Sequence, residues 1–137
     1  MEMQIKKFKD LKNEEIINYL NQIKNYNIFH TPAIINYQLS IRPECKNLSF
    51  FCLDKNVPLA FVPLGIIDSS NIKKISLGND PCQLPIINND MHSDLKKKLL
   101  DEIYKKIYLI LKENDVDYAD FFYHPVFVQN LNLKTLM

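Results

Sequence analysis

The stretch SDLKKKLLDEIYKKIYLILK, residues 93–112, predicts a long amphipathic helix. Its apolar residues recur at spacings of three and four, which places them on one helical face; they are Leu95, Leu99, Ile103, Ile107, Ile110 and Leu111. Most of its lysines fall on the opposite face, which is interpreted as solvated, with a binding patch as the alternative. A helix of about five turns that packs one face on a core is therefore the most secure element of the chain.

Upstream of this helix the sequence favours a β-hairpin. Residues 48–53 are rich in strand-forming side chains, residues 54–56 are polar, and residues 57–67 resume the strand pattern. Pro58 and Pro63 each remove a donor from the strand ladder. The second strand is therefore predicted to lie at an edge or to carry a bulge.

The remaining segments complete an α+β pattern. A third strand is predicted over residues 72–77 and a fourth over residues 116–123. Two shorter helices precede the hairpin, one capped by Asn13 and one beginning at Thr31 and Pro32; Ser93 is the predicted cap of the long helix. A long helix between strands lets the last strand run parallel to a neighbour. We expect a mixed, mostly antiparallel sheet flanked by helices.

Composition is that of a single soluble domain over residues 1–137. Hydrophobic residues make up 47% and charged residues 24%, and no apolar run or signal peptide is evident, which favours a cytoplasmic protein without a membrane span. The formal net charge is +1 and Arg42 is the single arginine. A nucleic-acid partner is therefore not expected. The abundance of asparagine is interpreted as compositional drift.

The cysteines and glycines exclude several kinds of site. Three cysteines without regular spacing indicate reduced thiols and neither a disulfide framework nor a zinc ribbon. Two glycines, Gly65 and Gly78, are too few for a phosphate-binding loop, a dinucleotide fingerprint or a nucleophile elbow. The histidines lack metal-ligand spacing, so no metal is expected.

Two histidines are weak candidates for catalysis. His30 lies just before a predicted helix, where it is either a general base or a residue that shapes the helix start. His124 follows the last predicted strand, a position where ligand contacts are common in sheet proteins, although an ordinary loop residue is the alternative. Gly78, Asn79 and Asp80 end the third strand and are candidates for substrate binding or for a plain turn.

The motifs FHTPA (29–33), VPLAFVPL (57–64) and ISLGNDP (75–81) together resemble the N-terminal half of FemAB/CelD-like acyltransferases, which belong to the GNAT superfamily. Residues 29–33 (FHTPA) resemble a helix start of that family, although Ile34 and Ile35 stand where an aromatic residue is frequent. Residues 57–64 (VPLAFVPL) resemble its second strand, and residues 75–81 (ISLGNDP) resemble a strand end that leads to the substrate cleft. The likeness extends from about residue 8 to about residue 125.

The resemblance implies a GNAT-like fold and the acceptor-side domain of an N-acyltransferase. Members of the family carry two such halves and transfer an acyl or aminoacyl group to an amine of a sugar or cell-envelope precursor. The resemblance places Gly78, Asn79 and Asp80 in the substrate cleft. A base assists attack of the acceptor amine, for which His30 and His124 are candidates.

The chain departs from this family in the glycine-rich loop that binds the acyl-CoA pyrophosphate. Neither glycine is followed by the second glycine of that loop, so no acyl donor such as acetyl-CoA is expected to bind this chain alone. A second GNAT-like half or a further copy of the chain is then the expected partner, whether the chain is a fragment or a short family member. A catalytically inert GNAT-like module and an unrelated α+β domain are the alternatives.

Overall fold

The computed structural model describes residues 2–69, 72–77, 82–116, 119–123 and 127–131. Three α-helices lie within these residues, α1 (Asn13–Ile23), α2 (Pro32–Ile41) and α3 (Ser93–Glu113), with short 3₁₀ turns η1 (Phe8–Asp10) and η2 (Ile28–His30). The strands are β1 (Gln4–Lys7), β2 (Cys45–Asn47), β3 (Phe50–Asp54), β4 (Val57–Val62), β5 (Gly65–Ser69), β6 (Ile72–Ile75), β7 (Cys82–Gln83), β8 (Ile86–Ile87), β9 (Ala119–Tyr123) and β10 (Phe127–Leu131). The predicted α+β class is confirmed.

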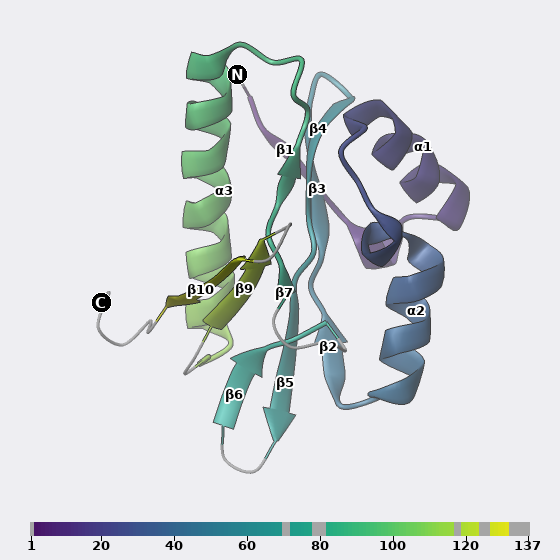
Figure 1. Cartoon of the computed structure of the whole chain (residues 1–137), viewed down its shortest axis with the longest axis vertical. Coiled ribbons are helices and arrows are strands. Elements are labelled where there is room, and N and C mark those ends of the chain that lie inside the picture. The colour runs from purple at the N-terminus through teal and green to yellow at the C-terminus, as the bar shows by residue number, and fades with distance from the viewer. Residues whose placement is uncertain (1, 70–71, 78–81, 117–118, 124–126, 132–137) are drawn as a thin grey trace.

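The strands lie between two helical layers. Figure 1 shows α3 on one side of the strands and α1 and α2 on the other. The strand orders are β1-β3-β4-β8, β2-β5-β6 and β10-β9-β7. All pairs are antiparallel except β7 and β9, which run parallel. The prediction that the strand after the long helix runs parallel to a neighbour is therefore confirmed.

The predicted single strand over residues 57–67 is wrong, because it breaks at Pro63 into β4 and β5. Proline has no backbone donor, so the ladder cannot continue through it. The Ser49 hydroxyl replaces the missing bonds: its Oγ accepts from Leu64 N at 2.9 Å and donates to Leu64 O at 3.2 Å. This buried serine satisfies the backbone at the break.

The two sheets that meet at this break form one long ribbon. Asn47 pairs with Gly65 in the β2–β5 ladder, and Phe50 pairs with Val62 in the β3–β4 ladder. Between these two pairs the chain advances by the same number of residues on each strand. The pairing register is therefore the same on both sides of the break at Pro63. Gly65 is needed here because a Cβ at this position would overlap the backbone oxygen of Ser76.

The bulge expected from Pro58 is present. Cys52 pairs with Ala60, but the next residue of β3, Leu53, pairs with Pro58. Leu59 is therefore the extra residue, and the bulge accommodates a proline that cannot donate to the ladder.

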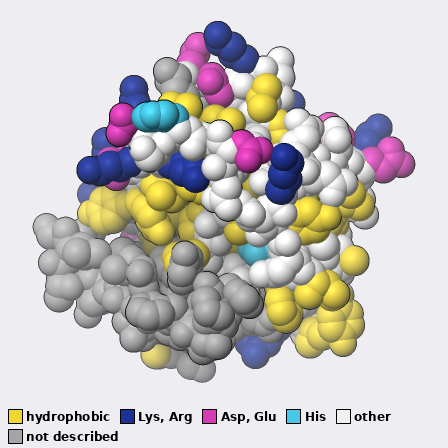
Figure 2. Space-filling model, turned by 45° about the horizontal axis from the view of Figure 1, so that its top comes forward, with side chains coloured by type: hydrophobic (Ala, Val, Ile, Leu, Met, Phe, Trp, Pro, Cys, Tyr) yellow, Lys and Arg dark blue, Asp and Glu magenta, His cyan; other side chains and the backbone are white. Residues whose placement is uncertain are grey.

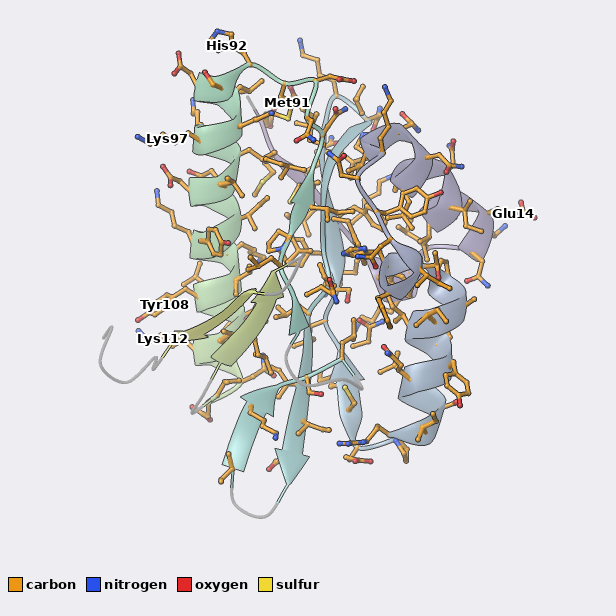
Figure 3. All side chains as sticks on the ribbon, in the orientation of Figure 1. Glu14, Met91, His92, Lys97, Tyr108 and Lys112 are labelled. Carbon is orange, nitrogen blue, oxygen red and sulfur yellow. The ribbon has the colours of Figure 1, made fainter. Side chains whose placement is uncertain are left out.

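The core contains most of the residues that the helical periodicity predicts; of the predicted stripe of α3, Ile110 packs against the core only in part, and Leu95 is half-buried outside the core cluster. Phe51 and Phe61 stack at the centre with ring centroids 4.5 Å apart. The long helix buries its apolar stripe, namely Leu99, Ile103, Ile107 and Leu111. Its lysines lie on the other side, and Figure 3 shows Lys97 and Lys112 pointing away from the strands. No described helix is both long and apolar enough to cross a membrane.

The predicted caps of the first and last helices are displaced by one residue. Asn13 is the first helical residue of α1, and Glu15 accepts from the backbone N–H of Lys12 at 3.1 Å. Ser93 likewise begins α3, and the cap position belongs to His92. These acids and caps satisfy backbone donors that a helix start leaves free.

Candidate functional site

A cavity of about 540 Å³ lies where the connection between α1 and α2, the β7–β8 segment and α3 meet. Its lining residues come from these three parts of the chain and are Asn25, Asn27, His30, Gln83, Leu84, Pro85, Ile86, Ile87, Asn89, Leu100 and Tyr104. Cavities of this size, bounded by apolar walls and a few polar groups, are typical of small-molecule sites.

The described lining of this cavity carries no ionised side chain. It combines the amides of Asn25, Asn27, Gln83 and Asn89 with His30, Tyr104 and apolar residues. In Figure 2 charged side chains gather in the upper part of the face, whereas hydrophobic and uncharged side chains cover its middle. A charged ligand would lose hydration here without gaining a counter-ion, so the lining suits an uncharged polar molecule.

His30 is the buried polar group of the cavity wall. It ends η2, and its side chain is only 2% exposed, with the ring edge against Phe61 at a centroid distance of 6.1 Å. The backbone N–H of Asn27 donates to His30 Nδ1 at 3.0 Å. Burial lowers the pKa of His30 to about 4, so the ring is neutral at pH 7.

The second ring nitrogen of His30, Nε2, has no hydrogen-bond partner in the described part of the chain. Among the described residues, His30 Nε2 is the one buried side-chain nitrogen or oxygen that makes no hydrogen bond. A buried polar group without a partner costs about 1–3 kcal/mol, and because Nε2 is inaccessible to solvent it is not open to a ligand in the cavity.

The connection between α1 and α2 is held against β8 and the residues that follow it by two long-range contacts. Asn25 Nδ2 donates to Ile87 O at 3.0 Å, and Lys24 Nζ lies 3.1 Å from Asp90 Oδ2. Both partners of the ion pair are largely exposed, so it contributes at most about 1 kcal/mol. The amide bond of Asn25 is therefore the more specific link between the cavity walls.

The turn that carries His30 also has its own local bonds. Asn27 Oδ1 accepts from Phe29 N at 2.8 Å, and the Thr31 hydroxyl donates to Ile28 O at 2.6 Å. Thr31 thus precedes α2, and its side chain does not cap the helix. These bonds fix the backbone around His30 and hence the direction of its ring.

Of the residues predicted for the site, the structure describes only His30. Gly78, Asn79, Asp80 and His124 lie outside the described residues. Their substrate-binding and catalytic roles therefore stay predictions. The general-base role of His30 also stays a prediction, although its low pKa and occupied Nδ1 favour hydrogen bonding over proton transfer.

Sequence reasoning missed most of the lining. Asn25, Asn27 and Asn89 were interpreted as drift, and Gln83 and Tyr104 carry no motif. The one available signal is the asparagines that flank the first predicted helix and precede the third predicted helix. The sequence does not show that these segments meet, because only the folded chain brings them to one cavity.

Other reactive groups of the described chain lie outside the cavity lining. Burial raises the pKa of the Cys52 thiol to about 12, so Cys52 is not an activated nucleophile. Cys45 Sγ donates to Ser76 O at 2.9 Å. Within the described ranges, no three His, Cys, Asp or Glu side chains are grouped so as to hold a metal ion.

Comparison of the chain with known proteins gives no significant match to a family model, a curated protein or a solved structure.

Proposed function

We propose that this chain is the acceptor-side domain of an N-acyltransferase and that the cavity holds an amine-bearing sugar or cell-envelope precursor. The observation that carries the proposal is the cavity itself, whose described lining carries amides and apolar side chains and no ionised group. Amide side chains both donate and accept hydrogen bonds, which suits ligands that present several hydroxyl groups.

The order of elements supports the GNAT-like part of the proposal. Two helices precede an antiparallel arrangement of strands, and a long helix then leads to a strand parallel to β7. This agrees with the mixed sheet flanked by helices that the resemblance to FemAB/CelD-like proteins implies. In the proposal, residues 1–137 are the N-terminal one of two such halves.

An uncharged cavity also suits the chemistry of acyl transfer. Only the neutral form of an amine is a nucleophile, and burial without a nearby carboxylate lowers the pKa of a bound amine. The amine then attacks the thioester or ester carbonyl of the donor and loses its proton to a base, and the amide forms as the carbonyl–sulfur or carbonyl–oxygen bond breaks and the donor's thiolate or alkoxide leaves. Because His30 is a poor base at its low pKa, we assign proton removal to a group outside the described lining.

The acyl donor is assigned to a partner half. The start of α3 offers Asp94 in its first turn and no glycine, so an anionic pyrophosphate is not favoured there. η2 and α2 expose Ile28, Tyr37 and Ile41, each more than half accessible, to which a second half could pack.

The alternative function is an inert GNAT-like binding module, which is favoured by the lack of an ionised side chain in the described lining of the cavity.

Calorimetric titration with glucosamine and with acetyl-CoA tests this proposal. Glucosamine is expected to bind better at about pH 9, where its amine is neutral, than at about pH 6, and acetyl-CoA is expected not to bind. Leu100→Trp fills the cavity and should abolish glucosamine binding. Leu109→Trp makes the same change at an exposed position of the same helix and should leave it intact.

Two results would contradict the proposal. Equal glucosamine binding by wild type and Leu100→Trp would place the sugar elsewhere. One-site binding of acetyl-CoA would make the chain a donor-binding enzyme. Addition of a partner half loaded with acyl donor distinguishes an acceptor-side domain from an inert binding module. Only the acceptor-side domain would then yield acylated sugar.

A further inference from the structure

The chain between α1 and η2 contributes to one wall of the cavity and is fastened to a second wall by side chains at the surface. Asn25 Nδ2 donates to Ile87 O at 3.0 Å, and both residues line the cavity, so this bond joins two of its walls. Lys24 Nζ lies 3.1 Å from Asp90 Oδ2. Residues 24–26, which carry both contacts, form a strap between the end of α1 and η2.

The strap lies between parts of the fold that are held firmly. β8 pairs with β4, and directly after it Asn88 N donates to Leu59 O at 2.9 Å. On either side of the strap, Ile23 at the end of α1 and His30 at the end of η2 are buried. The strap itself exposes all three of its side chains. Local opening is therefore expected in the strap rather than in the elements that it joins.

Lys24, the first residue of the strap, has a strained backbone. Its φ of 78° lies in the region that favours glycine. Its ψ of −37° is far from the value of about +47° of the left-handed residues that commonly end helices. Such a conformation persists only where surrounding contacts hold it. Release of those contacts lets Lys24 return to an ordinary backbone conformation, so the strain favours opening.

The contacts that hold the strap are weak enough to break reversibly. The side chains of Lys24 and Asp90 are 67% and 70% exposed, so water and salt screen this ion pair. Asn25 is also exposed, so water can replace its bond to the backbone of β8. Tyr26 OH donates to Asn21 Oδ1 at 2.8 Å, but Asn21 belongs to α1, so this bond can persist when the strap leaves β8.

We propose that the strap is a gate of the cavity, which opens when Asn25 leaves Ile87 O and Lys24 leaves Asp90. Opening separates two lining residues and widens the cavity between them. The ion pair makes the gate sensitive to salt. The inference concerns access to the cavity and is independent of the ligand that the cavity holds.

Amide hydrogen exchange of the whole chain at low urea concentrations measures the opening without a ligand. The N–H of Asn27 is the reporter, because its peptide follows the strap and its bond to His30 Nδ1 at 3.0 Å breaks on opening. Its exchange should be faster than that of the N–H groups of β3 and β4 and should not depend on urea, as expected for a local opening. Exchange of β3 and β4 should accelerate with urea, because it requires global unfolding.

Two variants test which contacts hold the gate shut. Asn25→Ala removes one fastening and should speed the exchange of Asn27 N–H about fivefold. Tyr26→Phe is the matched control, because it also removes one exposed side-chain hydrogen bond of the strap. It should leave the exchange of Asn27 N–H unchanged, since the bond to Asn21 persists in the open state.

Asp90→Asn tests the gate without removing a ligand contact, because Asp90 lies outside the described lining. It should speed the exchange of Asn27 N–H about twofold, and about 1 M NaCl should have that effect on wild type but not on this variant. NMR line shapes with glucosamine at about pH 9 should show association and dissociation that are both about twofold faster, with Kd nearly unchanged.

Exchange of Asn27 N–H with the rate and urea dependence of β3 and β4 would show that the strap opens only on global unfolding, and would overturn the inference. Equal acceleration by Asn25→Ala and Tyr26→Phe would also overturn it, as would unchanged glucosamine rates in Asp90→Asn. A wild type that does not bind glucosamine would contradict the proposed function alone, because the exchange measurements need no ligand.

Discussion

At the scale of single residues, His30 shows how burial and one backbone bond determine chemistry. The ring is removed from solvent, which disfavours its charged form, and Nδ1 is occupied by the N–H of Asn27. The same imidazole on the surface would titrate near neutral pH and serve as a base. Here the ring is neutral and closed off from solvent, so its position before a helix did not reveal the chemistry of this histidine.

The low pKa of His30 makes the stability of the protein depend on pH. The unfolded chain binds a proton at His30 near pH 6.5, whereas the folded chain does so only near pH 4. Between these values the unfolded state holds more protons, so stability falls as pH decreases. We expect the wild type to lose about 2 kcal/mol more than His30→Asn between pH 7 and pH 4.5, measured by urea unfolding. Equal losses in both proteins would show that His30 is not buried as a neutral ring.

At the scale of secondary structure elements, Ser49 joins the two sheets. Its hydroxyl bonds both backbone groups of Leu64 where Pro63 interrupts the ladder. Ser49→Ala leaves the buried Leu64 N–H without its partner and should cost about 1–3 kcal/mol in urea unfolding. Ser40→Ala is the matched control, because the Ser40 hydroxyl bonds Tyr37 O on an exposed helix surface. It should change stability by no more than about 0.5 kcal/mol; equal effects would remove the role assigned to Ser49.

The turn between β3 and β4 is an element with an unfavourable sequence. Lys55 and Asn56 have φ values of 49° and 66°, in the left-handed region that asparagine and glycine adopt at lower cost. Replacing them together by Asn and Gly should raise the free energy of unfolding by about 1 kcal/mol. The same two changes at Lys46 and Asn47 act on the extended strand β2 and should lower it. A loss of stability at the β3–β4 turn would contradict the turn conformation described here.

At the scale of the whole molecule, the long-range order was predictable and the short strands were not. The apolar stripe of α3 and the parallel strand after it follow from periodicity and chain connectivity. β7 and β8 have two residues each and lie on either side of Pro85, so they are too short to show a strand pattern. β1 consists mostly of lysine and other polar side chains, so it also lacks a strand pattern. These segments acquire strand geometry from the neighbours with which they pair.

The cavity escaped prediction for the same reason. Its walls belong to a connection before α2, two short strands around a proline and the middle of α3, which are far apart in sequence. Only folding brings their amides together, and isolated asparagines have no pattern that distinguishes ligand contacts from drift. His30 was found because histidine is a rare titratable residue, not because its neighbours marked a site.

The most direct test of the account is two-dimensional amide NMR of the whole chain titrated with glucosamine at about pH 9. Shifts are expected to concentrate at the cavity lining, at Asn27, His30, Gln83 and Tyr104, and Leu100→Trp is expected to abolish them. Absence of shifts, or shifts confined to residues away from this lining, would show that the cavity is not the site of acceptor binding.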